Sequence, residues 1–264
     1  MDLVRVKKQL DVTRTDQDDL LQGYIDAQWG GPGQGWYRIV TSPWQAREVI
    51  NDGKMAVVMG IETSVPFGCT FKRVLGSDQP ACDEAQIDEW LDRVRGWGVR
   101  QMELVNKFDN ALSGVAGDEG DTGAAVNNAN FLETGTYWDM QHCEPENPDA
   151  HDKNQIAPPE ISAEQQDALF GAIAQIYGAT TTLPVYPAPD HCNSRGLTGL
   201  GEHVIEGLAR RKMLFDPDHM SVKARKASLD LVEDMGYSGV LSSHSWSTPD
   251  AYPRIYANKG FVTP

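Results

Sequence analysis

The sequence has no apolar stretch long enough to span a bilayer, and its first residues, MDLVRVKKQL, lack the apolar segment of a signal peptide. Basic residues are also few. The chain has 23 Lys and Arg against 38 Asp and Glu, which gives a formal net charge of -15. Phosphate contacts need patches of Lys and Arg, so this balance argues against nucleic-acid partners. With 264 residues and 40% hydrophobic residues, the chain is expected to form one sizeable core.

Several chemical motifs are missing as well. No Lys-Ser/Thr follows the glycine-rich stretch at residues 30–35, so it is not a phosphate cradle. None of the four cysteines forms a CxxC pair, which argues against a zinc ribbon. The cysteines lie in loop-like sequence and permit disulfides such as Cys69–Cys82, although three pairings are open. Loop disulfides favour an exported or periplasmic location, whereas the missing signal peptide argues the other way.

Strand-like and helix-like segments alternate along the chain, which predicts parallel βαβ units in an α/β fold. Met55–Ile61 is a continuous apolar run and predicts a strand buried on both faces. No internal repeat or linker divides the sequence, so a single domain over residues 1–264 is expected. The expected strands are residues 36–40, 55–61, 99–105, 181–186, 213–215 and 240–241. The expected helices are residues 1–28, 43–50, 83–97, 162–176, 198–208, 221–232 and 249–258.

Two long stretches have little periodicity. Residues 63–82 are predicted to form a loop, and residues 111–160 are rich in Gly, Asp, Asn and Pro. The second stretch predicts a long loop insertion at about residues 108–160. Loops of that length are usually functional or disordered, and a solvated insertion is the simplest alternative.

Two consecutive strand–helix units each end their strand with a histidine. The strand at 213–215 leads to His219, and the strand at 240–241 leads to His244. Glu62 ends the apolar run in the same way. The carboxyl ends of parallel strands meet at one edge, where sites are built, so the three side chains are expected to face one pocket. A histidine at a strand end is often only a satisfied polar group, but equivalent positions in successive units favour a shared role.

Two imidazoles and one carboxylate, with positions left for water, are the ligand set of a catalytic Zn²⁺ site. Such an ion lowers the pKa of water and polarises a carbonyl, which predicts metal-assisted hydrolysis of an amide-like bond. The same ligand set also binds non-haem iron, so the residues leave the metal open.

Several segments, in order, resemble the renal (membrane) dipeptidase family of metal-dependent hydrolases, in the amidohydrolase-like barrel group. GKMAVVMGIE resembles the family strand that ends in a glutamate bridging two zinc ions, and GVRQMELVNKFDN resembles its LGVRYLTLTH strand. GLTGLGEHVIEGLARRKMLFDPDHMS and LSSHS resemble its GLT…IDLSHVS segment and its FSHS strand. The resemblance runs from about Trp36 onward and implies a (β/α)8 TIM-type barrel that hydrolyses dipeptide-like or other small amide substrates.

The resemblance assigns roles to individual residues. It implies that Glu62 is the bridging carboxylate and that His219 and His244 bind one of the metals. Arg254 falls near a family arginine that binds the substrate carboxylate, with a surface arginine as the alternative. Asp216 matches the aspartate of IDLSH, which supports the ligands without binding the metal. Asn106 stands where the family has a histidine that grips the tetrahedral intermediate, and it is the second expected substrate contact.

The departures from the family pattern limit these expectations. The family's first metal needs a His-x-Asp motif, and the sequence contains none. Its catalytic aspartate lies beyond the segment that matches LSSHS, so no catalytic residue is assigned here. The resemblance therefore implies an incomplete barrel without its first and last strands, with one Zn²⁺ site in place of two and impaired activity. Its unpaired strand edges predict self-association. The alternatives are a non-catalytic metal- or ligand-binding protein and a structural remnant without a site.

Overall fold

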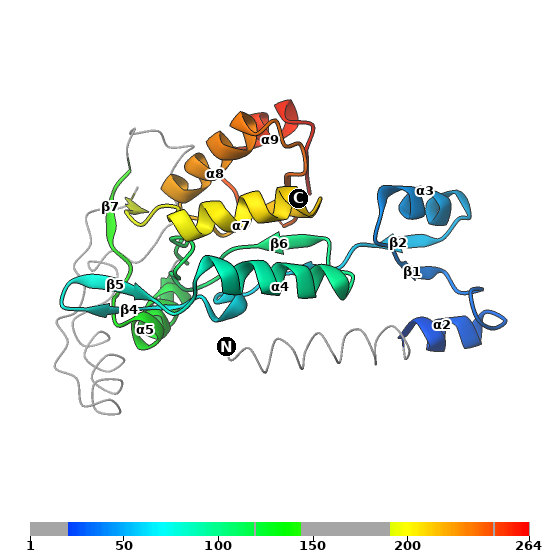
Figure 1. The fold of residues 1–264 in the computed structure, drawn as a ribbon, viewed down its shortest axis with the longest axis horizontal. Helices are drawn as coiled ribbons and strands as arrows, with labels where there is room; N and C mark the ends of the chain where they lie inside the picture. The colour runs from blue at the N-terminus through cyan, green and yellow to red at the C-terminus, as the bar shows by residue number, and fades with distance from the viewer. Residues whose placement is uncertain (1–20, 119, 144–190, 245, 264) are drawn as a thin grey trace.

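The computed structural model describes residues 21–118, 120–143, 191–244 and 246–263 (Figure 1). Its helices are α2 (Gly23–Gln28), α3 (Pro43–Asn51), η2 (Pro66–Gly68, a 3-10 helix), α4 (Glu84–Gly96), α5 (Gly120–Thr134), α7 (Gly199–Arg210), α8 (Val222–Asp234) and α9 (Tyr252–Ala257). Its strands are β1 (Tyr37–Ile39), β2 (Met55–Val57), β3 (Gly60–Ile61), β4 (Phe71–Val74), β5 (Ser77–Pro80), β6 (Gln101–Glu103), β7 (Met140–His142), β8 (His191–Asn193), β9 (Leu214–Asp216), β10 (Leu241–Ser242) and β11 (Phe261–Val262). Residues 1–20 of the helix predicted at 1–28, and the segments predicted at 162–176 and 181–186, lie outside the described residues.

Parallel strands form the body of the molecule. Strand β6 is the centre of a three-stranded parallel sheet in the order β3-β6-β9. A parallel bridge between Phe215 and Val240 brings the chain that enters β10 beside β9, and β10 pairs in parallel with β11. A mixed α/β fold with parallel strands is therefore confirmed. The described strands form no closed barrel, so the predicted TIM-type barrel is not shown.

Three helices of the body begin at a side-chain cap. Asp83, Thr198 and Ser221 accept a hydrogen bond from the backbone amide three residues later, at the start of α4, α7 and α8, respectively. Each cap satisfies one of the amides that a helix start leaves without a partner. The predicted caps at Thr198 and Ser221 are thereby confirmed.

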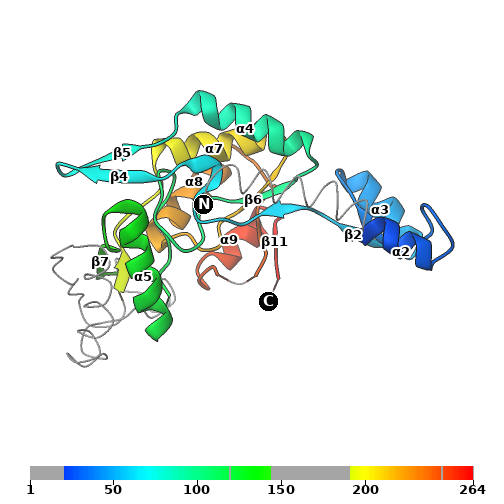
Figure 2. The same ribbon diagram turned by 90° about the horizontal axis from the view of Figure 1, so that it is seen from below.

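The helices α4, α7 and α8 pack side by side and cover the parallel sheet (Figure 2). Their apolar faces meet the sheet in one core that includes Leu91, Met102, Leu208, Phe215 and Leu229. Burying an apolar side chain of this size stabilises the fold by roughly 1.5–3 kcal/mol. The core therefore holds the carboxyl ends of β3, β6 and β9 in fixed positions relative to one another.

The apolar run Met55–Ile61 differs from its prediction. It divides into β2, which pairs in parallel with β1, and β3, which pairs with β6. The prediction that the whole run is buried on both faces is wrong, since Met55 and Val58 are each about half exposed. Strands β1 and β2 with helices α2 and α3 form an N-terminal unit that projects from the body in both views (Figures 1 and 2).

The stretches predicted as loops contain regular structure. Residues 63–82 include η2 and the antiparallel hairpin of β4 and β5. Within the predicted insertion, residues 109–118 are buried and α5 follows. The segment was not predicted because polar residues are buried among its apolar ones. Asn110, for example, is fully buried and accepts hydrogen bonds from the Leu112 and Ser113 amides. Such side chains satisfy the backbone where no apolar periodicity is visible.

All four cysteines form disulfides, Cys69–Cys82 and Cys143–Cys192. The structure thus selects one of the three pairings left open by the sequence. The second disulfide lies at the end of the antiparallel pair of β7 and β8.

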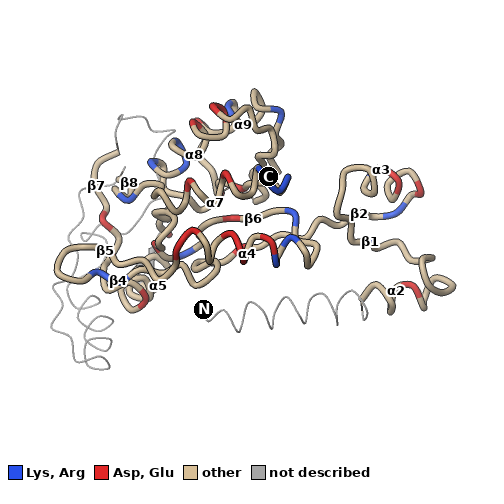
Figure 3. Tube along the Cα trace, viewed as in Figure 1, with Lys and Arg blue, Asp and Glu red and all other residues tan. Residues whose placement is uncertain are grey.

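Both acidic and basic residues occur on α4, α7 and α8 (Figure 3). Arg211 on the end of α7 contacts Asp88 and Asp92 of α4 at 3.1 and 2.7 Å. The excess of acid is therefore partly paired on the surface. None of the described helices has both the length and the hydropathy of a membrane span.

Candidate metal centre

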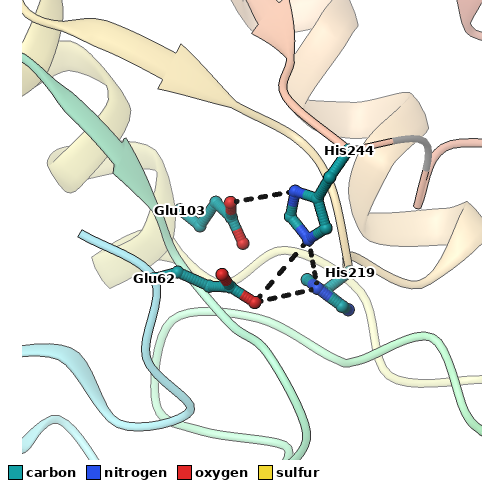
Figure 4. Close-up of side chains that lie close together, drawn as sticks. All are labelled: Glu62, Glu103, His219 and His244. Atoms are coloured by element: carbon teal, nitrogen blue, oxygen red, sulfur yellow. Dashed lines mark hydrogen bonds and ion pairs between the residues drawn. The ribbon is translucent and has the colours of Figure 1, made fainter. Parts of the chain in front are cut away.

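Four side chains from four strand ends meet at one edge of the parallel sheet (Figure 4). Glu62 directly follows β3, Glu103 is the last residue of β6, and His219 and His244 follow β9 and β10. One ligand atom of each lies within 4.8 Å of a ligand atom of every other. The strand register explains this convergence, because the pairs Ile61–Met102 and Glu103–Asp216 align the strands at the same level.

The two imidazoles and Glu62 form the tightest part of this group. The His219 and His244 Nε2 atoms are 2.8 Å apart, and Glu62 Oε1 lies 3.2 Å from the first and 3.6 Å from the second. A zinc–nitrogen bond is about 2.0–2.1 Å long, so a single ion can reach both rings. The structure therefore brings together the three side chains that the sequence predicts as metal ligands.

His219 is held in an uncommon backbone conformation. Its φ is 62°, in the left-handed region that few residues other than glycine adopt. Such a conformation costs of order 1–3 kcal/mol and persists only where the surroundings impose it. Here the His219 carbonyl accepts a hydrogen bond from the Ala116 amide at 2.7 Å, and Ser221 caps α8 two residues later. The turn between β9 and α8 thus fixes the direction of a buried imidazole.

Glu103 belongs to the group, and the sequence reasoning missed it. Its side chain is almost fully buried, and Oε2 has no hydrogen-bond partner in the described part of the chain. Its other oxygen, Oε1, lies 3.4 Å from the Ser243 hydroxyl and 3.6 Å from His244 Nδ1. Burial, reinforced by the nearby charges of Asp216, Glu62 and Asp218, raises the pKa of Glu103 to about 10. The available signal was an acidic residue placed between two apolar residues, Met102 and Leu104, inside a predicted strand.

Two buried aspartates, Asp216 and Asp218, lie beside His244. Asp218 accepts hydrogen bonds from the Ser242 and Ser247 hydroxyls and from the His244 amide, and its Oδ2 lies 3.4 Å from His244 Nδ1. Asp216 accepts from Gln101 Nε2 at 2.8 Å and from two backbone amides. Burial and the charge of Asp218 raise the pKa of Asp216 to about 7. Carboxylates beside a ligand imidazole orient the ring.

The two expected substrate-binding residues lie in different surroundings. Asn106 is at the centre, where its side-chain amide donates a short hydrogen bond to Glu62 Oε1. Arg254 is not brought there. Its guanidinium is paired with Asp230 and Glu233 of α8 at 2.7 and 2.8 Å. The expectation rested on the distance along the chain from His244, which does not indicate which face of α9 carries the arginine.

An aromatic ring and a lysine lie beside the centre. The ring centroids of Trp246 and His219 are 4.4 Å apart, and Lys107 Nζ lies 4.1 Å from the Trp246 ring centroid. Lys107 is itself paired with Asp118 at 2.7 Å. Among the described residues, no Lys or Arg forms an ion pair with the acids of the centre, Glu62, Glu103, Asp216 and Asp218. The centre therefore has an excess of carboxylates that a bound cation would balance.

A parallel α/β sheet with a Glu–His cluster at its carboxyl edge is thus the class of structure observed. No protein-family model matches this chain, and no curated protein matches it. Among solved structures, the chain is similar to an amidohydrolase from Pseudomonas aeruginosa, with 11% sequence identity and a TM-score of 0.49. The similarity covers 94% of this chain and 48% of the other, so the chain spans about half the length of that protein. At this identity and TM-score the similarity establishes neither a family nor an activity.

Proposed function

We propose that this chain is the metal-binding part of a hydrolase that cleaves a dipeptide-like or other small amide. Glu62, His219 and His244 would hold one zinc ion. The observation that carries the proposal is the approach of two imidazole Nε2 atoms and a carboxylate oxygen within 3.6 Å of one another, from three strand ends. Hydrolysis of an amide is the reaction implied by the resemblance of these segments to the renal dipeptidase family.

The donor set fits a divalent cation. Imidazole and carboxylate are ligands that zinc accepts, and non-haem iron uses the same types. Glu103 Oε2, a buried carboxylate oxygen with no hydrogen-bond partner among the residues that the structure describes, faces the same space. Leaving charged groups bare in a core is costly, and metal coordination is one of the few ways to compensate for it.

The chain's own residues would prepare the centre for its ion. Asp218 holds the backbone amide of His244 and lies beside its Nδ1, which leaves Nε2 facing Glu62. Asn106 donates to Glu62 Oε1 and so fixes the carboxylate that approaches both rings. When bound, a zinc ion would supply Lewis acidity toward a carbonyl and a nucleophile at neutral pH. Trp246, whose ring centroid lies 4.4 Å from that of His219, would exclude water from one side of the site.

A second candidate function is non-catalytic metal binding on the same scaffold. The position of Asn106 favours it, because its amide is engaged by Glu62 and stands where the resemblance implies a histidine for the tetrahedral intermediate. The two candidates share the metal centre and differ only in whether the bound ion turns over a substrate.

Two wider predictions also remain proposals. The two disulfides support an exported or periplasmic location, because such bonds persist mainly in oxidising compartments. Self-association through unpaired strand edges is expected because β3 and β11 each have a hydrogen-bonded neighbour on only one side among the described strands.

The metal centre is tested by thermal unfolding with and without Zn²⁺. A ligand that binds only the folded state stabilises it by about 2.7 kcal/mol at a hundredfold excess over Kd, so the midpoint should rise. The rise should disappear in His219→Ala and persist in the matched control His203→Ala, whose partly buried imidazole contacts Asp88 of α4 and is not part of the centre. An equal rise in both variants would show that zinc binds elsewhere. Dipeptide cleavage by the zinc-loaded protein then separates the hydrolase from the non-catalytic alternative.

A further inference from the structure

We infer that Glu103 is a fourth protein ligand of the metal, so that the centre is a two-histidine, two-carboxylate site. This inference rests on the proposed metal centre and adds to it a residue that the family resemblance does not implicate. In the family strand LGVRYLTLTH, the position that aligns with Glu103 is a threonine. The evidence for this role comes from the position, burial and contacts of the Glu103 side chain.

The strand register places Glu103 beside the other acids of the centre. On one side of β6, Glu103 pairs with Asp216 of β9. On the other side, Met102 pairs with Ile61 of β3, so the next residues of the two strands, Glu103 and Glu62, stand at the same level. Figure 4 shows the Glu103 carboxyl group beside the His244 ring and facing Glu62. One ligand atom from each of Glu62, Glu103, His219 and His244 lies within 4.8 Å of the other three.

The two oxygens of Glu103 have different surroundings. Oε1 lies near the Ser243 hydroxyl and His244 Nδ1, whereas Oε2 is buried and has no hydrogen-bond partner among the described residues. Buried carboxylate oxygens are almost always satisfied, so an exception of this kind calls for an explanation. An ion held by Glu62 and the two imidazoles would give Oε2 its missing partner.

Charge balance supports the same conclusion. Two carboxylates and two neutral imidazoles carry a total charge that a divalent cation neutralises. With Glu62 as the sole anionic ligand, Glu103 would remain in the core beside Asp216 and Asp218 without a cation of its own. The competing explanation is that Glu103 is a neutral carboxylic acid with a structural role.

Glu103→Gln separates these two roles because glutamine has the shape of the protonated acid but offers no anionic oxygen. The Zn²⁺ dissociation constant is measured by chelator competition for the wild type, Glu103→Gln and two reference variants. Glu62→Gln removes a proposed ligand, and Glu202→Gln removes one acid at the start of α7. We expect Glu103→Gln to weaken zinc binding at least tenfold, as Glu62→Gln does, and Glu202→Gln to bind within twofold of the wild type.

A second measurement excludes an indirect effect through His244. In the Co²⁺-loaded protein, the visible absorption spectrum reports the ligands of the ion, and Glu103→Gln should change it. In a His244→Ala background, Glu103→Gln should still weaken zinc binding, since a residue that acts only by orienting the ring would have no further effect there. Far-UV circular dichroism and metal-free unfolding verify that each variant is folded, and Glu103→Asp serves if the glutamine variant is not.

Wild-type affinity in Glu103→Gln, or weaker binding with an unchanged Co²⁺ spectrum, would overturn this inference and leave the three-ligand centre intact. Absence of zinc binding in the wild type would overturn both. The two failures are therefore distinguishable.

Discussion

Two strand–helix–strand units of this molecule share a plan and differ in their surroundings. In the N-terminal unit, α3 connects β1 to β2, and in the body α8 connects β9 to the chain entering β10. Both helices begin with a serine whose hydroxyl accepts a hydrogen bond from the amide three residues later, Ser42 and Ser221. The local signals for the two helices are therefore alike.

Packing distinguishes the two units. No residue of α3 is buried, and Trp44 and Ile50 are 71% and 60% exposed. Five residues of α8 are buried, among them Leu229 and Val232, because the helix lies against α7 and the sheet. Only the packed unit delivers side chains to the candidate metal centre. A βαβ pattern thus predicts local structure, whereas precise placement of a site depends on a second layer that covers the helix.

The largest expected difference between the units is in their core. Phe215→Ala removes a fully buried ring from β9 and should lower the free energy of unfolding by about 3–5 kcal/mol. Ile50→Ala, on α3, should change it by no more than about 0.5 kcal/mol. Chemical denaturation of both variants measures the two values. Similar losses would mean that the N-terminal unit is packed in solution.

Zinc should protect one unit and leave the other unchanged. At a hundredfold excess of zinc over Kd, binding raises the free energy of unfolding of the part that contains the site by about 2.7 kcal/mol. Amides that exchange only when this part unfolds should then exchange roughly a hundredfold more slowly. We expect this slowing in β6, β9 and α8 and none in β1 and α3. Hydrogen exchange followed by mass spectrometry resolves these segments. Equal protection of α3 would indicate that the two units unfold together.

The response to pH should have opposite signs in the two units. In the metal-free body the pKa values of Asp216 and Glu103 are raised to about 7 and about 10, so the folded state retains protons that the unfolded chain releases. Stability should fall as pH rises from about 4 to 7, by up to about 1.4 kcal/mol per pH unit for each group. Denaturation midpoints across this range test the slope, which Glu103→Gln should reduce.

In the N-terminal unit the carboxylate of Asp26 has the reverse behaviour. Hydrogen bonds from the Gly33 amide, and also from Arg38 and the Gly35 amide, lower the pKa of Asp26 to about 2. Its contribution is present above its ordinary pKa of 3.8 and is lost as pH falls toward 2. As the pH falls through that interval, the Gly33 and Gly35 amides should exchange faster relative to the same amides in free peptides. Unchanged protection down to pH 2 would contradict this account.

The smallest expected effect concerns the two serine caps. Ser42→Ala and Ser221→Ala each remove a hydrogen bond to a helix start and should cost about 1 kcal/mol locally. For Ser221 the cost should appear in global unfolding, since α8 is part of the core. For Ser42 it should appear only as faster amide exchange at the start of α3. A global loss from Ser42→Ala would remove the distinction between the units.

The sequence was informative wherever a local rule applied. The caps at Thr198 and Ser221 and the alternation of strands with helices follow from neighbouring residues, and the structure has them. Helix α5 was missed because its sequence has no clear apolar face, and β2 was expected to be buried because its composition matches that of an interior strand. The position of Arg254 depends on contacts with α8 that no local pattern contains.

For the candidate centre, the sequence by itself determined that Glu62, His219 and His244 end strands, because apolar runs and helix caps delimit those strands. Only the tertiary structure decided that Glu103 joins them, since its role depends on the register between β3, β6 and β9. It also decided that Arg254 is held at α8 and that the cysteines pair as 69–82 and 143–192. The physical reason is the same in each case. Strand ends and caps are set by interactions over a few residues, whereas register, helix packing and disulfide partners depend on residues far apart in the chain.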